Sequence, residues 1–557
     1  MPAGATSTDS LEGYVPFPPE RIEAYRASGW WQDLTFHDVL DRAADSRPDH
    51  PAVIGPHRTL TYRELAENSR RIATGFAHLG ISTHERVAFQ LPNCSEFVEA
   101  FFACSRIGAI PVMVLPRHRE AEVRHVIELV DAVAYLTAGD RYDRDFDYLD
   151  LIDAVKDDYS TLEHTIAVGS GDPARTGWTG FDRLRESPTK PIDRPVDPTD
   201  PGVMLLSGGT TGMPKGIPRT HNDYVFQWGR MADAVGYVDD WVAFPSVPIG
   251  HNASLCCVVG TTVWAGGTLA VEPQLKPASL MALIQRVGGN YSLPMPTQII
   301  DILEHPDLDE YDLSSLEVLV SGGQKVPPRA VYETAERWGV GFCNIFGMAE
   351  GPLICTRPDD DLDIQATTVG RPIAPEADEV RIVDLDRETE LPPGEAGELA
   401  VRGPGFFTGY FRNPEENTEN FDDAGWLYTE DIVAVRADGN VEVYGRIKDT
   451  IIRGGETIYA PGVEDVLVEH PSVANVAVVG KPDDRLGERP FAYVEPPEGV
   501  DPPTLPELQA FLDDRGMAVF KRPEGLEVVP DLPRTGVGKV DKAALEARVD
   551  GAVLSDQ

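Results

Sequence analysis

The sequence predicts an α/β protein with a large N-terminal domain of layered, mainly parallel sheets with helices, a small antiparallel β subdomain and a small α+β C-terminal domain. From residue 61 to about residue 323, short apolar runs alternate with helical patterns, which is typical of parallel sheets covered by helices. From about residue 367, turns containing Gly and Asp separate short strands, which favours antiparallel pairing. The chain has 557 residues, too many for one hydrophobic core.

The first 60 residues are expected to form an extension and a first helix. Residues 61–80 place Leu65, Ile72 and Phe76 on one face and end at glycine, as an amphipathic surface helix does. The next segments are predicted as strand, helix, strand, helix and strand at 86–91, 95–108, 110–116, 123–130 and 132–138. Further strands are predicted at 164–170, 202–208, 241–246, 267–273 and 316–323. Asp, Pro and Gly are frequent in residues 170–200, which are predicted to be a surface connection.

The C-terminal part of the sequence predicts the two smaller structural parts. Short strands are expected at 378–384, 394–403 and 439–446, with turn residues between them. After Lys448 a fresh α/β segment begins. The predicted domains are therefore residues 1–447 and residues 448–557.

The composition excludes several classes of protein. The net charge is −42 and only 10 of the 49 basic residues are lysine, which argues against a nucleic-acid or anionic-membrane partner. Such an acidic, lysine-poor chain resembles proteins of salt-loving microbes, because high salt screens self-repulsion. No apolar run is long enough to span a bilayer and no signal peptide is recognisable, so a soluble, cytoplasmic protein is expected. The six cysteines lack C-x-x-C spacing and are expected to be reduced core thiols.

A glycine-rich stretch at 205–221 is the first candidate for chemistry. Glycine allows backbone N–H groups to approach an anion closely, and hydroxyls and a cation add further contacts. An ordinary turn rich in Gly and Thr is the alternative. Pro214 and Gly216 flank Lys215, so the stretch does not fit the P-loop pattern. The candidate phosphate-binding residues are Ser207, Gly208, Gly209, Thr210, Thr211, Gly212 and Lys215, with Arg219 following.

The segment SGGTTGMPKG resembles the phosphate-binding motif of adenylate-forming enzymes, the superfamily of acyl-CoA ligases, aryl-acid adenylating enzymes and peptide-synthetase adenylation domains. NIFGMAEG at 344–351 is similar to a second motif of that superfamily. The resemblance implies that Phe346 and Gly347 lie by the adenine of ATP and that Glu350 binds Mg²⁺. Ala349 stands where the family usually has Thr. By itself, the glutamate would more often be a solvated or capping carboxylate.

Further segments match family motifs in the same order. SGGQ at 321–324 resembles the segment around the adenine and the acyl pocket. This resemblance implies that Gly323 and Gln324 bind ATP and that Gly322 binds the acid. WLYTEDIV resembles the ribose-binding element and implies Asp431, although Glu430 replaces the usual Gly; alone, such an Asp is often an Asx turn. The resemblance assigns the remaining roles as follows: Arg446 to ribose or phosphates, Lys448 to the hinge of a mobile C-terminal domain, and Lys539 to catalysis as the cation between substrate carboxylate and α-phosphate.

The acid-binding residues resemble those of enzymes that activate ortho-hydroxylated benzoates. His251 followed by Asn252 matches that subgroup. The match implies that His251 takes part in catalysis and in binding the acid, and that the Asn252 amide hydrogen-bonds the 2-hydroxyl. Met348 is implied to line the same pocket. Salicylate activators tend to have Cys and Leu where 2,3-dihydroxybenzoate activators have Ser and Val, and Cys257 and Leu353 stand at these positions. Salicylate is therefore favoured over 2,3-dihydroxybenzoate; plain core packing of both residues is the alternative.

The resemblance implies a two-step reaction that uses ATP and Mg²⁺. The acid becomes an aryl-AMP with release of pyrophosphate, and the acyl group then passes to the thiol of coenzyme A or of the pantetheine on an aryl carrier protein. Coenzyme A is slightly favoured. Three alternatives remain: another acyl- or benzoate-CoA ligase of the superfamily, a non-catalytic nucleotide-binding homologue, and a kinase or ATPase. The failed P-loop pattern disfavours the last of these.

Overall fold

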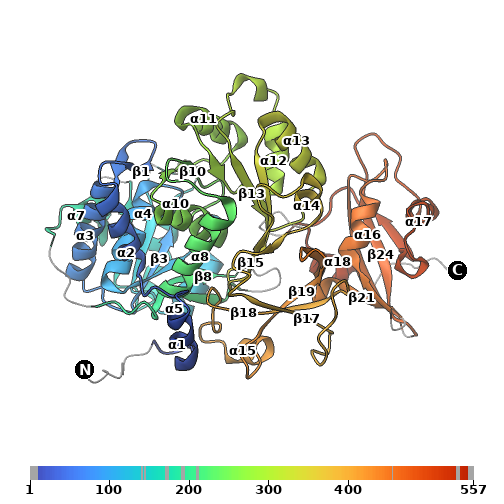
Figure 1. Ribbon diagram of the computed structural model, residues 1–557, viewed down its shortest axis with the longest axis horizontal. Helices are drawn as coiled ribbons and strands as arrows, with labels where there is room; N and C mark the ends of the chain where they lie inside the picture. The colour runs from blue at the N-terminus through green and yellow to red at the C-terminus, as the bar shows by residue number, and fades with distance from the viewer. Residues whose placement is uncertain are drawn as a thin grey trace. The chain divides into compact units, whose positions relative to one another are not determined.

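The structure is a computed structural model that describes residues 11–139, 142, 146–169, 175–189, 195–207, 213–453, 456–483, 485–534 and 540–549. These residues form two compact units (Figure 1). The first unit takes the described residues of Met1–Gly208, Met213–Glu379 and Val401–Leu427, and the second takes those of Val380–Ala400 and Tyr428–Gln557. Residues 380–400 and 428–447 thus group with the C-terminal residues. A functional division of the chain at Lys448 stays a prediction.

The first unit contains a seven-stranded sheet that is parallel except for one antiparallel pair at its edge. Val112, Tyr135 and Met204 are buried against helix α5 (Glu120–Val130), because apolar side chains occupy both faces of such a sheet. The antiparallel pair, β8 and β9, lies on either side of residues 207–215 of the glycine-rich stretch. In spatial order the strands are β7 (Trp178–Gly180), β6 (His164–Val168), β5 (Ala134–Ala138), β3 (Arg86–Gln90), β4 (Ile110–Met113), β8 (Pro201–Leu206) and β9 (Gly216–Thr220).

The first unit also contains a nine-stranded sheet. Its central strands are parallel, whereas β1 with β2, β14 with β15 and β15 with β16 are antiparallel. The carboxyl ends of β10, β13 and β14 therefore lie at one edge, which is where open α/β sheets bind ligands. In spatial order the strands are β16 (Arg371–Pro372), β15 (Leu353–Cys355), β14 (Gly341–Gly347), β13 (Val318–Gly322), β12 (Tyr291–Ser292), β10 (Val242–Phe244), β11 (Thr268–Ala270), β1 (Pro51–Ile54) and β2 (Thr59–Thr61).

Helices cover these sheets and begin where the sequence supplies caps. Thr35, Thr61 and Thr220 each form a capping box with an acidic residue three positions later, which satisfies amide groups that the helix leaves unbonded. The helices are α1 (Pro19–Ala27), α2 (Phe36–Ser46), α3 (Tyr62–His78), α4 (Ser95–Ile107), α5 (Glu120–Val130), α6 (Tyr148–Asp153), α7 (Phe181–Arg185), α8 (His221–Val235), α9 (Asn252–Ser254), α10 (Thr261–Ala265), α11 (Pro277–Val287), α12 (Pro296–Leu303), α13 (Pro328–Trp338), α14 (Leu362–Thr367) and α15 (Pro414–Asn420).

The second unit contains a five-stranded sheet and most of a four-stranded sheet. The four-stranded sheet has the order β17 (Glu379–Val383), β18 (Gly397–Arg402), β19 (Leu427–Val435) and β20 (Val441–Arg446). The five-stranded sheet has the order β22 (Glu456–Tyr459), β21 (Thr450–Arg453), β24 (Gly487–Glu495) and β23 (Asn475–Asp483), with β25 (Gly525–Val528) parallel to β24. Side chains of β23 and β24 alternate between two hydrophobic clusters, because successive residues of a strand face opposite sides. The helices are α16 (Ala460–Leu467), α17 (Leu505–Asp514) and α18 (Lys542–Val549).

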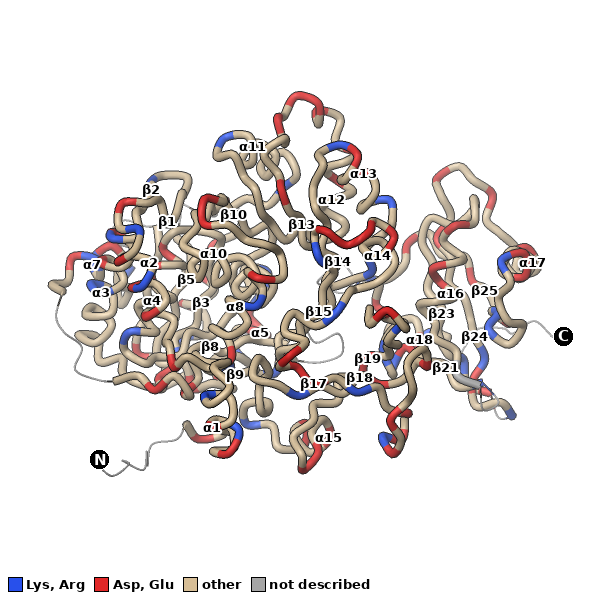
Figure 2. Tube along the Cα trace, in the orientation of Figure 1, with Lys and Arg blue, Asp and Glu red and all other residues tan. Residues whose placement is uncertain are grey.

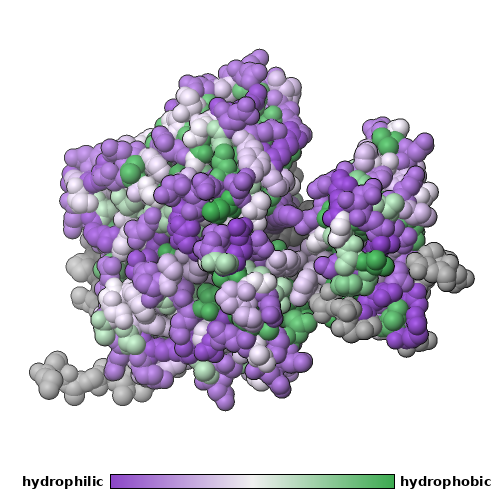
Figure 3. Space-filling view, turned by 45° about the vertical axis from the view of Figure 1, so that its right-hand side comes forward, coloured by the Kyte–Doolittle hydropathy of each residue, from purple (hydrophilic) through white to green (hydrophobic). Residues whose placement is uncertain are grey.

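Single turns of other helix types complete the structure: the π-helix η2 (Leu255–Gly260) and the 3₁₀ helices η1 (Lys156–Asp158), η3 (Leu308–Glu310), η4 (Ile447–Asp449) and η5 (Val519–Lys521). Among the described residues, no helix combines the length and apolar character that crossing a bilayer requires. Acidic residues outnumber basic residues in the sequence, and Figure 2 shows both along the Cα trace. Hydrophilic residues cover much of the face drawn in Figure 3.

The predicted fold class is confirmed, and the elements from residue 86 to 138 match β3, α4, β4, α5 and β5. Two local predictions were wrong. The N-terminal 60 residues hold two helices and two strands rather than one helix. The surface connection at 170–200 includes β7 and α7. One strand has no counterpart in the prediction: GIPRT pairs as β9 with β8, the strand before the predicted phosphate-binding residues.

Candidate active site

The ends of the glycine-rich stretch are held together by the hairpin of β8 and β9. The Ser207 N–H donates to the Lys215 carbonyl at 3.0 Å, and the Lys215 N–H donates to the Ser207 Oγ at 2.9 Å. The Lys215 ammonium lies 2.5 Å from the Glu416 carboxylate and 5.2 Å from the centre of the Tyr410 ring. The predicted phosphate-binding residues Gly208, Gly209, Thr210, Thr211 and Gly212 lie outside the described residues.

Glu350 lies in the turn between β14 and β15 and is 7% exposed. Its Oε1 accepts a hydrogen bond from the Tyr410 hydroxyl at 3.0 Å, and its carbonyl accepts one from the Phe407 N–H at 2.8 Å. Gly351 follows with φ +138°, and a Cβ there would lie 2.5 Å from the Phe406 Cα. The turn is therefore packed directly against residues 405–410, and only glycine fits at position 351.

Glu350 can hold a magnesium ion only together with other ligands. Within the described parts of the chain, no group of three or more His, Cys, Asp and Glu side chains could hold a metal. Mg²⁺ in nucleotide sites commonly takes one or two carboxylates, with water and substrate phosphates completing its shell. A single buried carboxylate beside the hairpin that is predicted to bind phosphates fits that pattern.

The turn that carries Glu350 is also held from inside the protein by Arg219, which is 0% exposed. The guanidinium donates to the carbonyls of Ala349 at 2.8 Å and Gly405 at 2.6 Å, and to the Asp223 carboxylate at 2.8 Å. It also donates to the Gln227 side chain, whose own amide donates to the Gly351 carbonyl. Arg219, which follows the predicted phosphate-binding residues in the sequence, thus bonds to acceptors inside the protein.

The residues predicted to surround the adenine follow β13 and β14. Gly322 ends β13 opposite Ile345, and a Cβ on it would lie 1.9 Å from the Ile345 carbonyl oxygen, so the two strands require glycine there. Gly323 has φ +76° and Gln324 is exposed. Phe346 and Gly347 end β14, with Phe346 half-buried. These predicted residues therefore share the carboxyl edge of two neighbouring parallel strands.

The residues predicted to bind the acid begin α9. His251 is exposed, and its Nδ1 accepts the Ala253 N–H at 3.2 Å, which leaves the proton of a neutral ring on Nε2. Asn252 accepts a hydrogen bond from the Tyr224 hydroxyl at 2.8 Å and donates one to the Met348 carbonyl at 3.3 Å. Met348 lies two residues before Glu350, so the residues predicted to bind the acid and the predicted metal ligand are joined through one turn.

Cys257 and Leu353 are both buried. Cys257 lies in η2, where a hydrogen bond with Cys256 and burial raise the pKa of its thiol well above the usual value, so it remains uncharged. Leu353 begins β15 and pairs with Gly347; a Cβ on Gly347 would lie 2.6 Å from the Leu353 Cδ2. Cys355 follows on the same face of β15 and is close enough to affect the Cys257 thiol electrostatically.

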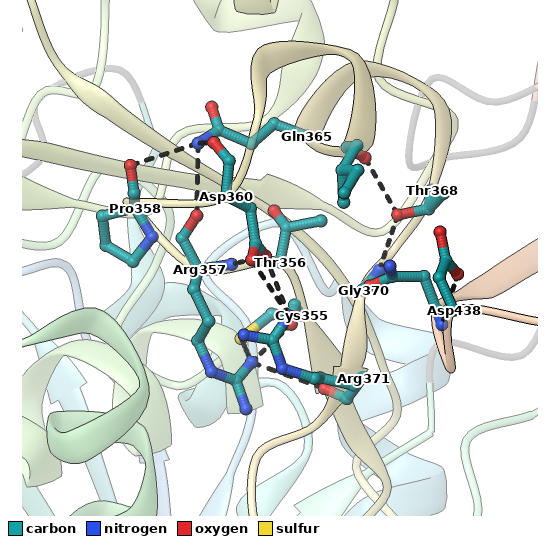
Figure 4. Close-up of polar contacts among 12 residues, drawn as sticks. Cys355, Thr356, Arg357, Pro358, Asp360, Gln365, Thr368, Gly370, Arg371 and Asp438 are labelled. Carbon is teal, nitrogen blue, oxygen red and sulfur yellow. Dashed lines mark hydrogen bonds and ion pairs between the residues drawn. The ribbon is translucent and has the colours of Figure 1, made fainter.

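A polar cluster fixes the position of β15 (Figure 4). Arg357 donates to the Pro372 carbonyl at 2.8 Å, which ties the end of β15 to β16. The Arg371 guanidinium lies 3.0 Å from the Asp360 carboxylate, and Gln365 donates to the Asp360 carbonyl at 2.8 Å. Leu353 is thus part of a strand whose backbone position is set by ion pairs and hydrogen bonds.

In the second unit, the structure brings two predicted nucleotide-binding residues together. Asp431 and Arg446 are directly opposite on β19 and β20, with 3.1 Å between the Asp431 Oδ1 and the Arg446 Nε. Asp431 lies within a strand and not in an Asx turn. Glu430 before it has φ +59°, a conformation that glycine adopts more easily. Lys448 is exposed in η4, between β20 and β21; Lys539 lies outside the described residues.

Comparison with known families decides what the chain is. The sequence pattern of the family described as "AMP-binding enzyme" matches residues 40–411. The chain belongs to the AMP-binding enzyme family. The pattern described as "AMP-binding enzyme C-terminal domain" matches residues 462–539. The resemblance to adenylate-forming enzymes that the sequence motifs predict is therefore confirmed.

Two relatives of this AMP-binding enzyme match it over nearly their whole length. The 2,3-dihydroxybenzoate-AMP ligase of Bacillus subtilis (strain 168) is 37% identical, covering 98% of this chain and 99% of the relative. The salicyl-AMP ligase / salicyl-S-ArCP synthetase of Mycobacterium tuberculosis is 40% identical, covering 96% of this chain and 94% of the relative. The apo structure of Mycobacterium smegmatis MbtA is 37% identical with a TM-score of 0.73, covering 97% of this chain and 99% of that one.

Sequence reasoning missed several residues that contact the predicted site residues of this AMP-binding enzyme or the turn that carries them: Tyr224, Gln227, Phe407, Tyr410 and Glu416. Each lies in a different segment from the motif residue that it contacts, so motif matching does not find it. For Tyr224 a signal did exist, because a tyrosine three residues into a buried helix requires a partner for its hydroxyl. Its partner Asn252 is 28 positions away in the sequence.

Proposed function

We propose that this AMP-binding enzyme activates an ortho-hydroxylated aromatic carboxylic acid with ATP and transfers the acyl group to a thiol. One observation carries the proposal: Asn252, implied to contact the acid, bonds Met348 in the same turn as Glu350, implied to hold Mg²⁺–ATP. Acid and triphosphate would then meet at one edge of the nine-stranded sheet. The names of the two relatives, a 2,3-dihydroxybenzoate-AMP ligase and a salicyl-AMP ligase, support an aryl acid as substrate.

In the first step, a carboxylate oxygen of the acid attacks the α-phosphorus of ATP. The new O–P bond forms as the bond to pyrophosphate breaks, which gives the aryl-AMP. Bound Mg²⁺ would offset negative charge on the phosphates. Ser207, Lys215 and the glycine-rich stretch hold the β- and γ-phosphates, and Lys539 donates to the acid and the α-phosphate, where negative charge grows. No nucleophile of the protein is needed; the protein contributes positioning and electrostatic stabilisation.

In the second step, a thiol attacks the acyl carbon and AMP leaves. The C-terminal residues turn about Lys448, which withdraws Lys539 from the site. Asp431 and Arg446 hold the ribose of the nucleotide. Coenzyme A is the favoured thiol; the pantetheine of an aryl carrier protein is the other acceptor, and the name of the Mycobacterium tuberculosis relative includes such a thioester, salicyl-S-ArCP.

Salicylate is the favoured acid. The uncharged Cys257 thiol and the apolar Leu353 side chain are buried and offer no strong hydrogen-bonding partner to a 3-hydroxyl. Burying that hydroxyl unsatisfied costs roughly 1–3 kcal/mol. We therefore expect an ATP–pyrophosphate exchange assay at high salt to show about 10-fold higher kcat/KM with salicylate than with 2,3-dihydroxybenzoate, since about 1.4 kcal/mol corresponds to one factor of ten.

A preference for 2,3-dihydroxybenzoate, or for a fatty acid, would contradict this choice of acid. The same mixtures supplied with coenzyme A should yield AMP and salicylyl-CoA. ADP as the nucleotide product would indicate a kinase or ATPase and would reject the proposed reaction altogether.

Tyr410 should support the function of Glu350. We expect Tyr410→Phe to lower kcat/KM for MgATP about 10-fold and to raise the Mg²⁺ concentration for half-maximal activity, because a hydrogen bond to a charged group contributes about 1.5–3 kcal/mol. Pyrophosphate exchange over a Mg²⁺ series measures both. Tyr142→Phe is the matched control, since the Tyr142 hydroxyl also donates to a buried carboxylate, that of Glu96, at 2.7 Å, and neither residue has a predicted role in the site. Equal effects of the two variants would exclude a specific role for Tyr410.

A further inference from the structure

Two neighbours determine the orientation of the Asn252 side-chain amide. One neighbour is the Met348 carbonyl, 3.3 Å from the Asn252 Nδ2. A backbone carbonyl can only accept hydrogen bonds, so the amide nitrogen must face it. The other neighbour is the Tyr224 hydroxyl, which donates to the Asn252 Oδ1 at 2.8 Å. The oxygen of the amide therefore faces Tyr224.

Tyr224 is a rigid donor. It is 0% exposed, and its ring centre lies 5.8 Å from those of Phe36 and Trp228. The Arg219 guanidinium lies 5.1 Å from the same ring. Burial raises the pKa of the Tyr224 hydroxyl well above its usual value, so the hydroxyl keeps its proton. A packed ring with a permanent proton holds the Asn252 oxygen toward the interior of the protein.

The open side of the amide is consequently its nitrogen. Asn252 is only half-buried, whereas Tyr224 is inaccessible, so the Oδ1 points inward; no described residue accepts the second N–H of Nδ2, which can therefore bond a ligand. An N–H needs an acceptor. In a 2-hydroxybenzoate the hydroxyl donates its proton to the neighbouring carboxylate, which leaves the phenolic oxygen as an acceptor. In a 2-aminobenzoate, one N–H bonds the carboxylate and the other points outward, toward a second donor.

We propose that Tyr224 is a specificity-determining positioning residue: it holds the amide of Asn252 so that an ortho-hydroxyl is accepted and an ortho-amino group is rejected. This inference rests on the proposed aryl-acid site. A site that pairs well with one group discriminates strongly against an analogue that leaves a buried polar group unpaired. Tyr224 would not touch the acid itself; it would act through Asn252.

The test measures adenylation of salicylate and of 2-aminobenzoate by pyrophosphate exchange. In Tyr224→Phe the packed ring remains but the donor is lost, so only the 3.3 Å bond to the Met348 carbonyl still orients the amide, which can then turn its oxygen to the acid more readily. We expect the ratio of kcat/KM for salicylate to that for 2-aminobenzoate to fall at least about 10-fold, mainly through KM for the acids, with KM for ATP unchanged. A thermal unfolding midpoint measured alongside reports any loss of folding.

Two further variants complete the experiment. Tyr62→Phe is the matched control: Tyr62 is equally buried and its hydroxyl donates to the Gly267 carbonyl at 2.7 Å, so this variant should keep the wild-type ratio. Asn252→Asp, which presents only acceptors, should lower the ratio even if Tyr224→Phe does not fold. An unchanged ratio in the folded variants would overturn the role of Tyr224. A wild-type enzyme that activates neither acid would instead overturn the proposed function.

Discussion

Lys539→Ala is expected to lower adenylation at least 100-fold while the transfer of a supplied aryl-adenylate to a thiol is largely retained. The resemblance to adenylate-forming enzymes assigns this lysine to the first step only, as the cation that stabilises charge between the acid and the α-phosphate. Removing one preorganised group of this kind typically costs about 10²–10³ in rate. Pyrophosphate exchange measures the first step, and thioester formation from chemically prepared salicyl-AMP measures the second.

The control for this experiment is a lysine that also lies in the C-terminal residues but has no assigned role. Lys521 lies in η5 with its ammonium 5.9 Å from the centre of the Phe520 ring, and Lys521→Ala should keep both steps. Loss of both steps in Lys539→Ala would contradict an account in which Lys539 serves adenylation and is withdrawn for thioester formation.

Arg219→Met is expected to cause the largest loss of stability among single substitutions near the site, about 3–5 kcal/mol. The substitution leaves the Asp223 carboxylate buried without its cation, and it removes the donors that hold the carbonyls of Ala349 and Gly405. Burial raises the pKa of Asp223, whereas the neighbouring Arg219 guanidinium acts to lower it, so loss of Arg219 further disfavours the charged form of Asp223. Denaturant unfolding of the variant and the wild type, followed by fluorescence, measures the difference.

Two comparisons separate the buried charge from other effects. Arg329→Met removes an arginine that also bonds two carboxylates, Glu304 and Glu333, but is 52% exposed, and it should change stability by less than about 1 kcal/mol. Adding Asp223→Asn to Arg219→Met should recover part of the loss, because no buried charge then lacks a partner. A double variant as unstable as the sum of the single ones would show that the ion pair is not the cause.

The elements that could be predicted from sequence are those with a strong local pattern. Residues 95–107 form α4 and residues 86–90 form β3, because apolar periodicity and the glycine at position 108 act over a few neighbouring residues. β7 and β9 were missed for the opposite reason. Trp178–Gly180 and Gly216–Thr220 contain Gly, Pro and polar residues, and they become strands only through pairing with β6 and β8.

The sequence by itself determined the family, the order of the motifs and the residue types that adenylation requires, because each motif is a short contiguous segment. Only the tertiary structure decided which residues hold these motif residues in place. Tyr410 reaches Glu350 across 60 positions, and Arg219 reaches Gly405 across 186 positions. Such contacts leave no local pattern, since their partners meet only after the sheets have formed. For this reason the orientation of Asn252, and with it the proposed choice between hydroxyl and amino groups, could not be predicted from its motif.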